Sequence, residues 1–258
     1  MPKNEDGDMI KNNQGNILEL EEKLMGQSCG KIAESGDKID LSKFEWIFFD
    51  IGGVLADESK ANELRMQADL EIIQRHNPEV SMQDIVDAYW SSASASFGDI
   101  DRNLFRIFLQ DEVLVKEAVE ILKERKKTWP SYHERNFIRP EAQKVLEALS
   151  KKHKLGIIAN QPKCARKLLE DAGIEKYFTF TGLSDEHDLH KPDPAFFEKV
   201  LQYSGADPKT AVMIDDSVER GILPAKKLGL ATIRFKGGQN EKNANITDFE
   251  IDSLEDLL

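Results

Sequence analysis

A short apolar run that ends in a single carboxylate constrains the fold of this chain more than any other feature. Residues 46–50 (WIFFD) are rich in strand-forming side chains, and Gly52 and Gly53 follow Asp50 after one residue. In an open α/β sheet, ligands bind just beyond the carboxyl ends of the strands. Glycines at that point allow a sharp turn and a close approach of a ligand to the main chain. Asp50 is therefore a candidate nucleophile toward phosphorus, although the same pattern also fits an aspartate that caps the next turn.

The charge of the chain narrows the class of partner. The net charge is −12 over 258 residues, which argues against a duplex nucleic-acid binder because such proteins need a cationic face. A small anionic substrate is still compatible, since local groups would hold it. No apolar stretch approaches membrane-spanning length, and the first residues lack the apolar core of a signal peptide. We expect a cytoplasmic protein without a membrane partner, in which Cys29 and Cys164 are reduced thiols.

The first half of the chain contains a polar segment and, after the first strand, a segment with helical periodicity. Residues 1–43 are polar, and we expect a mostly disordered tail with one short helix near 17–24. Residues 59–136 show helical spacing of apolar side chains without an intervening strand. The helices expected there cover 61–75, 81–89, 102–109 and 112–129. This block predicts an all-helical cap inserted after the first strand.

Beyond residue 139 the pattern alternates between strand and helix. Strands are expected at 154–159, 177–181, 211–215 and 231–235, and helices at 162–172, 193–203, 219–228 and 251–258. Such alternation is typical of a parallel sheet covered by helices on both faces. We therefore predict an α/β fold, a doubly wound parallel sheet built from residues 44–58 and 137–258, with the helical cap at 59–136.

Polar groups lie at or near the ends of four expected strands. They are Asp50, Asn160 after Ala159, Lys191 in a Lys-Pro-Asp-Pro loop, and the pair Asp215-Asp216. The carboxyl ends of parallel strands meet at one edge of a sheet, so these residues can converge although they are distant in sequence. Each motif alone also fits an ordinary turn or helix cap.

In order and spacing, these motifs resemble those of the haloacid dehalogenase superfamily, in the subgroup with a helical C1-type cap. The resemblance runs from about residue 46 to residue 258. It implies that Asp50 attacks a phosphomonoester and forms an aspartyl-phosphate. It also implies a Mg²⁺ ion held by the Asp50 carboxylate, the Gly52 carbonyl and the Asp216 carboxylate, with Asp215 supporting this cluster from beside it.

The resemblance also assigns groups that hold the phosphoryl oxygens. Lys191 would neutralise their charge and keep the nucleophile ionised. Main-chain N–H groups at Gly52 and Gly53, and those around Ala159 and Asn160, would cradle the oxygens. Positioning and electrostatics of this kind supply most of the catalysis in phosphoryl transfer.

Three positions depart from the family pattern. Gly52 stands where a second aspartate usually serves as general acid and base, Ala159 replaces a Ser or Thr, and Gly221 replaces an acidic residue. General acid–base help is typically worth about 10²–10⁴ in rate. We therefore expect a slow or specialised phosphatase. Residues that could replace the missing acid, or be only solvated loop residues, are Asp57, Glu186, His187 and His190.

Two other functions remain open. The chain could be a non-enzymatic relative that binds a phosphorylated ligand or a protein partner. It could also be a dehalogenase, in which Asp50 attacks carbon, although that chemistry needs no metal and Asp215-Asp216 counts against it. The substrate depends on cap side chains facing the cleft, and Tyr89, Trp90, Phe97 and Arg106 are candidates for that face or for the interior of the cap.

Overall fold

The computed structural model describes residues 39–95, 100–237 and 246–258. The short helix expected near 17–24 lies outside these residues. Ordered packing begins upstream of residue 44, because Leu41 is buried in the main core. Within the described part of the chain, no helix is both long and apolar enough to cross a membrane.

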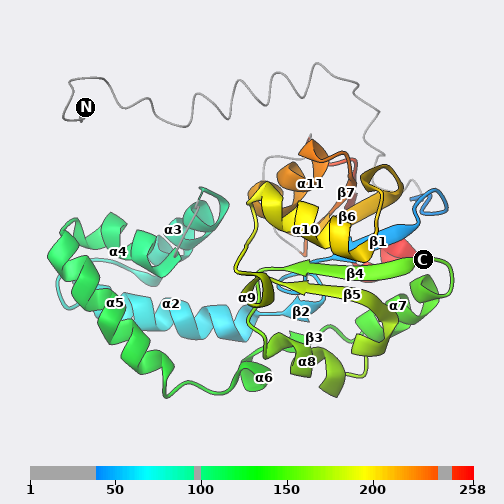
Figure 1. The fold of residues 1–258 in the computed structure, drawn as a ribbon. Helices are drawn as coiled ribbons and strands as arrows, with labels where there is room; N and C mark the ends of the chain where they lie inside the picture. Colours follow the sequence, from blue (N-terminus) through cyan, green and yellow to red (C-terminus); the bar gives the residue numbers. More distant parts are fainter. Residues whose placement is uncertain (1–38, 96–99, 238–245) are drawn as a thin grey trace, which may run out of the picture.

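A parallel sheet of six strands forms the centre of the molecule (Figure 1). Each strand pairs in parallel with its neighbours, so all carboxyl ends lie at one edge. The α/β prediction is therefore confirmed. In spatial order the strands are β5 (Phe178–Leu183), β4 (Lys154–Ala159), β1 (Trp46–Phe49), β6 (Ala211–Asp215), β7 (Ala231–Phe235) and β8 (Phe249–Ile251).

Alternate side chains of β1 enter two different cores, as the two-residue period of a strand requires. Ile47 and Phe49 pack on one face of the sheet. Trp46 and Phe48 pack on the other face, where their rings stack with centroids 5.3 Å apart. All four side chains are buried, which explains why the strand is an unbroken apolar run.

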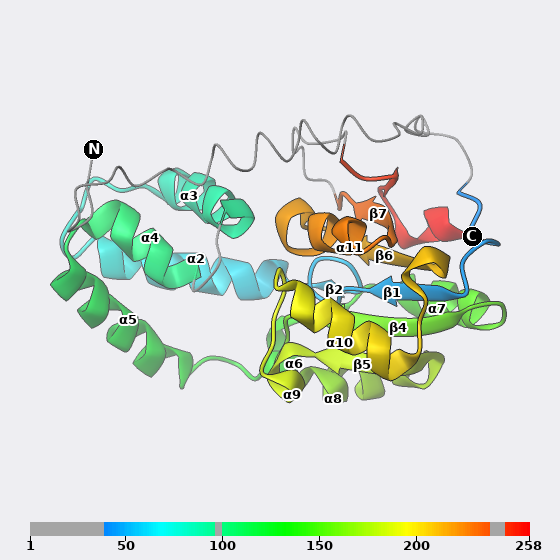
Figure 2. The ribbon, with the colours of Figure 1, turned by 45° about the horizontal axis from the view of Figure 1, so that its top comes forward.

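Helices cover both faces of the sheet (Figures 1 and 2). Side chains of α7 and α8 join the core on one face, and those of α10 and α11 join the core on the other. The helices of this part are α7 (Ala142–Ser150), α8 (Ala165–Asp171), α9 (Ser184–His187), α10 (Pro194–Ser204) and α11 (Leu223–Lys227). Shorter helical turns are η1 (Glu175–Tyr177), η2 (Pro208–Thr210), η3 (Val218–Ile222) and η4 (Leu254–Leu257).

The helical insert follows the first strand and has an apolar core of its own. Figure 1 shows α2 running from the sheet into this insert, with α3, α4 and α5 packed beyond it. Its elements are α2 (Ser59–Ile73), α3 (Met82–Ala95), α4 (Ile100–Leu109), α5 (Glu112–Lys126) and α6 (Tyr132–Arg135). We propose that these helices form the cap, with domain boundaries near 58/59 and 136/137.

The two connections of the insert are joined to each other and to the turn after Asp50. β2 (Ala56–Asp57) pairs antiparallel with β3 (Phe137–Ile138). Immediately after β3, the Arg139 guanidinium donates to the carbonyl oxygens of Val54 and Gly53, at 2.9 and 3.0 Å. The entry to and the exit from the insert are therefore fastened to the loop that carries the nucleophile candidate.

The structure differs from the sequence prediction at the C-terminus and in one core helix. Where a helix was expected over 251–258, Ile251 instead ends β8, and only the turn η4 follows, capped by the Ser253 hydroxyl. A three-residue strand is too short to show a period in sequence. The helix expected over 219–228 is divided into η3, which has the wider π-helical winding, and α11.

One glycine in the centre of the sheet makes a prediction about packing. A Cβ atom at Gly156 would overlap the ring of Phe48, which is fully buried. We expect Gly156→Ala to lower the free energy of unfolding by about 1–3 kcal/mol, because overpacking strains a dense core. Urea denaturation measures this value. Repeating the substitution in a Phe48→Leu background makes room for the methyl group, so an undiminished cost there would contradict the explanation.

Candidate active site

Asp50 lies at the end of β1, in the middle of the sheet edge. Its N–H donates to the Ile214 carbonyl at 2.9 Å, which extends the pairing with β6 by one residue. One carboxylate oxygen, Oδ1, accepts the Ile51 N–H at 2.8 Å. The other, Oδ2, lies 2.9 Å from Lys191 Nζ. The carboxylate is therefore oriented by two donors, and Asp50 is only 9% exposed.

Lys191 is a buried cation between two carboxylates. Its Nζ also lies 2.7 Å from Asp215 Oδ2, and the residue is 3% exposed. Burial acts to lower the Lys191 pKa, but the charges of Asp215 and Asp50 outweigh burial and raise it. The side chain of Asn160 fixes the main chain here, because its Oδ1 accepts the Lys191 N–H at 2.7 Å and its Nδ2 donates to the Lys191 carbonyl at 2.8 Å.

Three aspartates form a compact acidic cluster. Asp50, Asp215 and Asp216 each offer an oxygen within 4.8 Å of the others. Burial, followed by the charges of Asp215 and Asp50, raises the pKa of Asp216 to about 8. Burial likewise raises the pKa of Asp50 to about 6, although the Lys191 charge opposes the shift. Three carboxylates in this space need cationic compensation beyond Lys191.

Arg220 supplies part of that compensation. It lies in η3, where the Ser217 hydroxyl accepts both its main-chain N–H and its Nε–H at 3.3 Å. Burial acts to lower the Arg220 pKa, but the charges of Asp216 and the other two aspartates raise it. Even so, Asp216 Oδ1 is a buried oxygen with no hydrogen-bond partner among the described residues. A divalent cation with oxygen ligands fits this atom and the cluster around it.

Two glycines make room for the cluster. Gly53 has a φ of +73°, and a Cβ atom there would overlap the Asp216 carboxylate. A Cβ atom at Gly221 would overlap the Asp215 carboxyl group. The absence of the expected acidic residue at 221 therefore has a physical reason, because the Asp215 side chain occupies that space.

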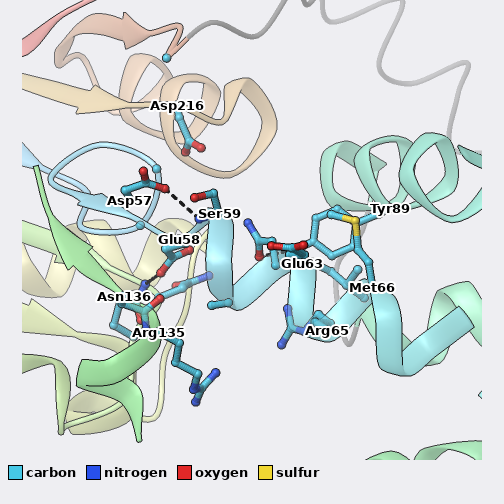
Figure 3. Close-up of a pocket in the computed structure, with 18 of the residues that line it drawn as sticks. Asp57, Glu58, Ser59, Glu63, Arg65, Met66, Tyr89, Arg135, Asn136 and Asp216 are labelled. Atoms are coloured by element: carbon cyan, nitrogen blue, oxygen red, sulfur yellow. Dashed lines mark hydrogen bonds between the residues drawn. The ribbon is translucent and has the colours of Figure 1, made fainter. Parts of the chain in front are cut away.

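A cavity of about 820 Å³ opens over these groups, between the sheet edge and the insert. Figure 3 shows Asp57, Glu58 and Asp216 at its core end, with Met66 and Tyr89 farther along α2 and α3. Of the residues singled out from the sequence, those that line it are Asp50, Gly52, Gly53, Asp57, Tyr89, Asn160, Lys191 and Asp216. The site residues that lie beneath the lining are Ala159 and Asp215, which are both fully buried.

Several candidates lie elsewhere. Glu186 pairs with Arg166 at 2.8 Å, and the His187 ring packs beside Phe196 and Tyr203. Neither they nor His190, which is exposed, line the cavity. In the insert, exposed Arg106 pairs with Glu112 at 2.7 Å. The side chain of Trp90 and the whole of Phe97 fall outside the part that the structure describes.

Many residues that line the cavity were not singled out from the sequence, and four of them bear directly on the chemistry. Arg220 stands four residues after Asp216, and that spacing in the turn after a strand was a usable signal. The other three, Glu58, Tyr132 and Gln161, come from three separate segments and carry no motif. Only the fold brings them together.

Comparison with known proteins agrees with this geometry. Residues 44–229 match the model of the haloacid dehalogenase-like hydrolase family. A glyceraldehyde 3-phosphate phosphatase of Pyrococcus abyssi is 30% identical over 230 residues, covering 82% of this chain and 91% of its own. A phosphoglycolate phosphatase of Aquifex aeolicus is 26% identical over 214 residues, covering 82% and 94%.

Solved structures give the same fold. The haloacid dehalogenase-like family protein SP0104 of Streptococcus pneumoniae superimposes with a TM-score of 0.61 at 19% identity, over 84% of this chain and 97% of that one. The family model alone spans most of the present chain. The chain therefore belongs to the haloacid dehalogenase-like hydrolases and is a hydrolase of their phosphatase type.

Proposed function

We propose that this protein is a Mg²⁺-dependent phosphohydrolase that cleaves a small phosphorylated metabolite through an aspartyl-phosphate on Asp50. The observation that carries the proposal is the buried Asp50 carboxylate, held 2.9 Å from Lys191 and beside the acidic cluster, at the end of a cavity. A carboxylate with a fixed orientation and a cation beside it suits attack on a phosphoryl group.

The metal would be held by oxygen atoms of the acidic cluster. The Asp50 and Asp216 carboxylates and the Gly52 carbonyl are the proposed ligands, with Asp215 bound to Lys191 and to the Ser217 N–H beside them. When bound, Mg²⁺ would neutralise charge on the phosphoryl oxygens. The unpartnered Asp216 Oδ1 supports this assignment, because a buried carboxylate oxygen without a donor is costly.

The other site residues orient and select the substrate. Lys191 would balance the charge of the transferring phosphoryl group, and the main chain at Gly53 and Asn160 would contact its oxygens. The insert would close over the cavity, exclude water and contact the rest of the substrate. The relatives are named for phosphates of two- and three-carbon molecules, which supports a small phosphomonoester of this class.

The departures at Gly52 and Ala159 favour a second candidate. They remove a carboxyl group and a hydroxyl donor of the family pattern, so the protein could bind a phosphorylated ligand or a partner protein without turnover. The same departures are compatible with slow or specialised catalysis if another residue transfers the proton.

Removal of the nucleophile separates these two functions. We expect the wild type to hydrolyse p-nitrophenyl phosphate or 2-phosphoglycolate only with Mg²⁺, and Asp50→Asn to lower kcat on the order of 10⁴-fold or more. Mass spectrometry after acid quenching should detect a phosphoryl adduct on wild-type Asp50. Phosphate binding without turnover or adduct would favour the binding function. An exposed aspartate of the insert, Asp84→Asn, is the control.

The acidic cluster makes a second prediction, about pH. Without divalent cations, the folded protein retains a proton on Asp50 up to about pH 6 and on Asp216 up to about pH 8, whereas the unfolded chain has lost both above about pH 4. The free energy of unfolding should therefore fall as pH rises through this window, by up to about 1.4 kcal/mol per pH unit for each proton. The charges of Arg220 and Lys191 oppose the two pKa shifts but do not reverse them.

Urea denaturation in EDTA at several pH values measures the slope. Asp216→Asn should flatten it relative to the wild type, whereas Asp84→Asn should leave it unchanged because the pKa of Asp84 is lowered by its hydrogen bonds with Ser81. Added Mg²⁺ should raise the melting temperature more at pH 8.5 than at pH 6, since protons compete with the metal for the same oxygens. Equal slopes for wild type and Asp216→Asn would contradict the cluster's protonation.

A further inference from the structure

We propose that Glu58 is the general acid and base of this site, delivering from the start of α2 the carboxyl group that residue 52 lacks. The proposal rests on the proposed phosphatase function. Hydrolysis of an alkyl phosphate releases an alkoxide that needs a proton, and the water that cleaves the aspartyl-phosphate must lose one. A carboxyl group beside the reacting atoms can supply the first proton and accept the second.

The position of Glu58 follows from the space around Gly52. A Cβ atom built on Gly52 would lie 2.7 Å from Glu58 Oε2, 2.8 Å from its Cδ and 2.9 Å from its Oε1. A side chain on residue 52 would thus meet the carboxylate of Glu58 at its first carbon, so both side chains enter the same part of the site. Gly52 is not among the glycines with positive φ, so its backbone does not by itself require glycine. The carboxyl group of Glu58 replaces a side chain at 52 in space rather than in sequence.

Hydrogen bonds hold Glu58 in this position. Gln161 Nε2 donates to Glu58 Oε1 at 2.9 Å, and the Tyr132 hydroxyl donates to Gln161 Oε1 at 2.7 Å. Burial, with a further contribution from the Glu58 charge, raises the pKa of Tyr132, so its hydroxyl remains a donor. Because the Tyr132 hydroxyl donates to Gln161 Oε1, the NH₂ group of the Gln161 amide points toward Glu58. Oε2 lies nearest to the Gly52 position, and Glu58 lines the cavity.

The proton transfers balance over the two half-reactions. Asp50 attacks phosphorus, the bond from phosphorus to the leaving oxygen breaks, and protonated Glu58 gives its proton to that oxygen. Glu58, now a carboxylate, takes a proton from the incoming water as the water oxygen bonds to phosphorus. The Asp50–phosphorus bond then breaks, releasing phosphate and restoring protonated Glu58.

The neighbouring carboxylate is less suited to this task. Asp57 also lines the cavity (Figure 3), but its Oδ1 accepts the Ser59 N–H at 2.9 Å at the start of α2. Hydrogen bonds from the side chain and main chain of Ser59 lower the Asp57 pKa. A carboxylate committed to a helix start and held ionised is a poor proton donor. The side chain of Glu58, in contrast, makes no hydrogen bond to the start of α2.

Glu58→Gln tests the proton transfer while keeping the contact with Gln161. We expect kcat for 2-phosphoglycolate to fall about 10²–10⁴-fold. With p-nitrophenyl phosphate, whose leaving group needs little protonation, the first half-reaction should persist. A burst of p-nitrophenolate, with accumulation of phosphoryl-enzyme seen by mass spectrometry, should therefore precede slow turnover. Glu117→Gln, an exposed glutamate of α5 that does not line the cavity, is the matched control and should retain wild-type kinetics.

Moving the carboxylate from residue 58 to residue 52 tests whether the two side chains enter the same part of the site. Gly52→Asp alone should lower the melting temperature and give no gain in kcat, because its side chain meets the carboxylate of Glu58. Adding Glu58→Ala should restore the melting temperature and raise kcat at least about tenfold above Glu58→Ala alone. This rescue also keeps the proposal testable if Glu58→Gln proves poorly folded.

The outcomes separate this proposal from the function on which it rests. A wild type that forms no phosphoryl-enzyme would overturn the phosphatase function itself. An active wild type whose Glu58→Gln variant keeps its rate on 2-phosphoglycolate would overturn only the role of Glu58. Equal losses on both substrates without a burst, and no rescue by Asp at 52, would reduce Glu58 to a structural contact of the Tyr132–Gln161 network.

Discussion

The site depends on one buried ion network, in which a single lysine joins two carboxylates from different strands. Lys191 Nζ lies 2.9 Å from Asp50 and 2.7 Å from Asp215, with almost no exposure to water. Breaking such a network by removing one partner leaves an uncompensated buried charge, which costs about 3–5 kcal/mol. The loop of Lys191, the end of β1 and the end of β6 are therefore held in one arrangement, and the orientation of Asp50 follows from it.

The same rigidity makes the acidic cluster possible. Asp216 has a raised pKa and an oxygen without a protein donor, so by itself it favours protonation or a looser arrangement. The fold keeps it in place through Gly53 and Gly221, whose missing side chains give the carboxylates their room. An electrostatically unfavourable site that is held by its surroundings is ready to gain free energy when a cation binds. Stability and ligand affinity are opposed here, as is common at functional sites.

The sequence predicted the sheet and the convergence of its polar ends better than it predicted the completed site. The strand 211–215 is apolar up to Asp215, and the strand 154–159 is apolar after Lys154 and is followed by Asn160, so their limits were visible. The two-residue strands beside the insert were not, because their pairing depends on the tertiary fold rather than on a local period. Glu58 was missed for a related reason: its relation to Gly52 exists only across a turn, and no spacing rule describes it. The sequence also could not show which other acid candidates are held outside the cavity. Glu186, for example, pairs with Arg166, which lies 20 residues away in sequence.

The hydrogen bonds of Arg139 separate the helical insert from the loop that follows Asp50. The Arg139 guanidinium binds the carbonyl oxygens that follow the nucleophile turn, at the point where the chain returns from the insert. Anything inserted between β2 and β3 thus begins and ends at a frame that is already closed. The helices farthest from that frame, α3 to α5, can change in length, sequence or number, whereas Glu58 at the start of α2 and Tyr132 in α6 belong to the site. Diversification of substrate choice can in this way proceed independently of the chemistry that all the substrates share.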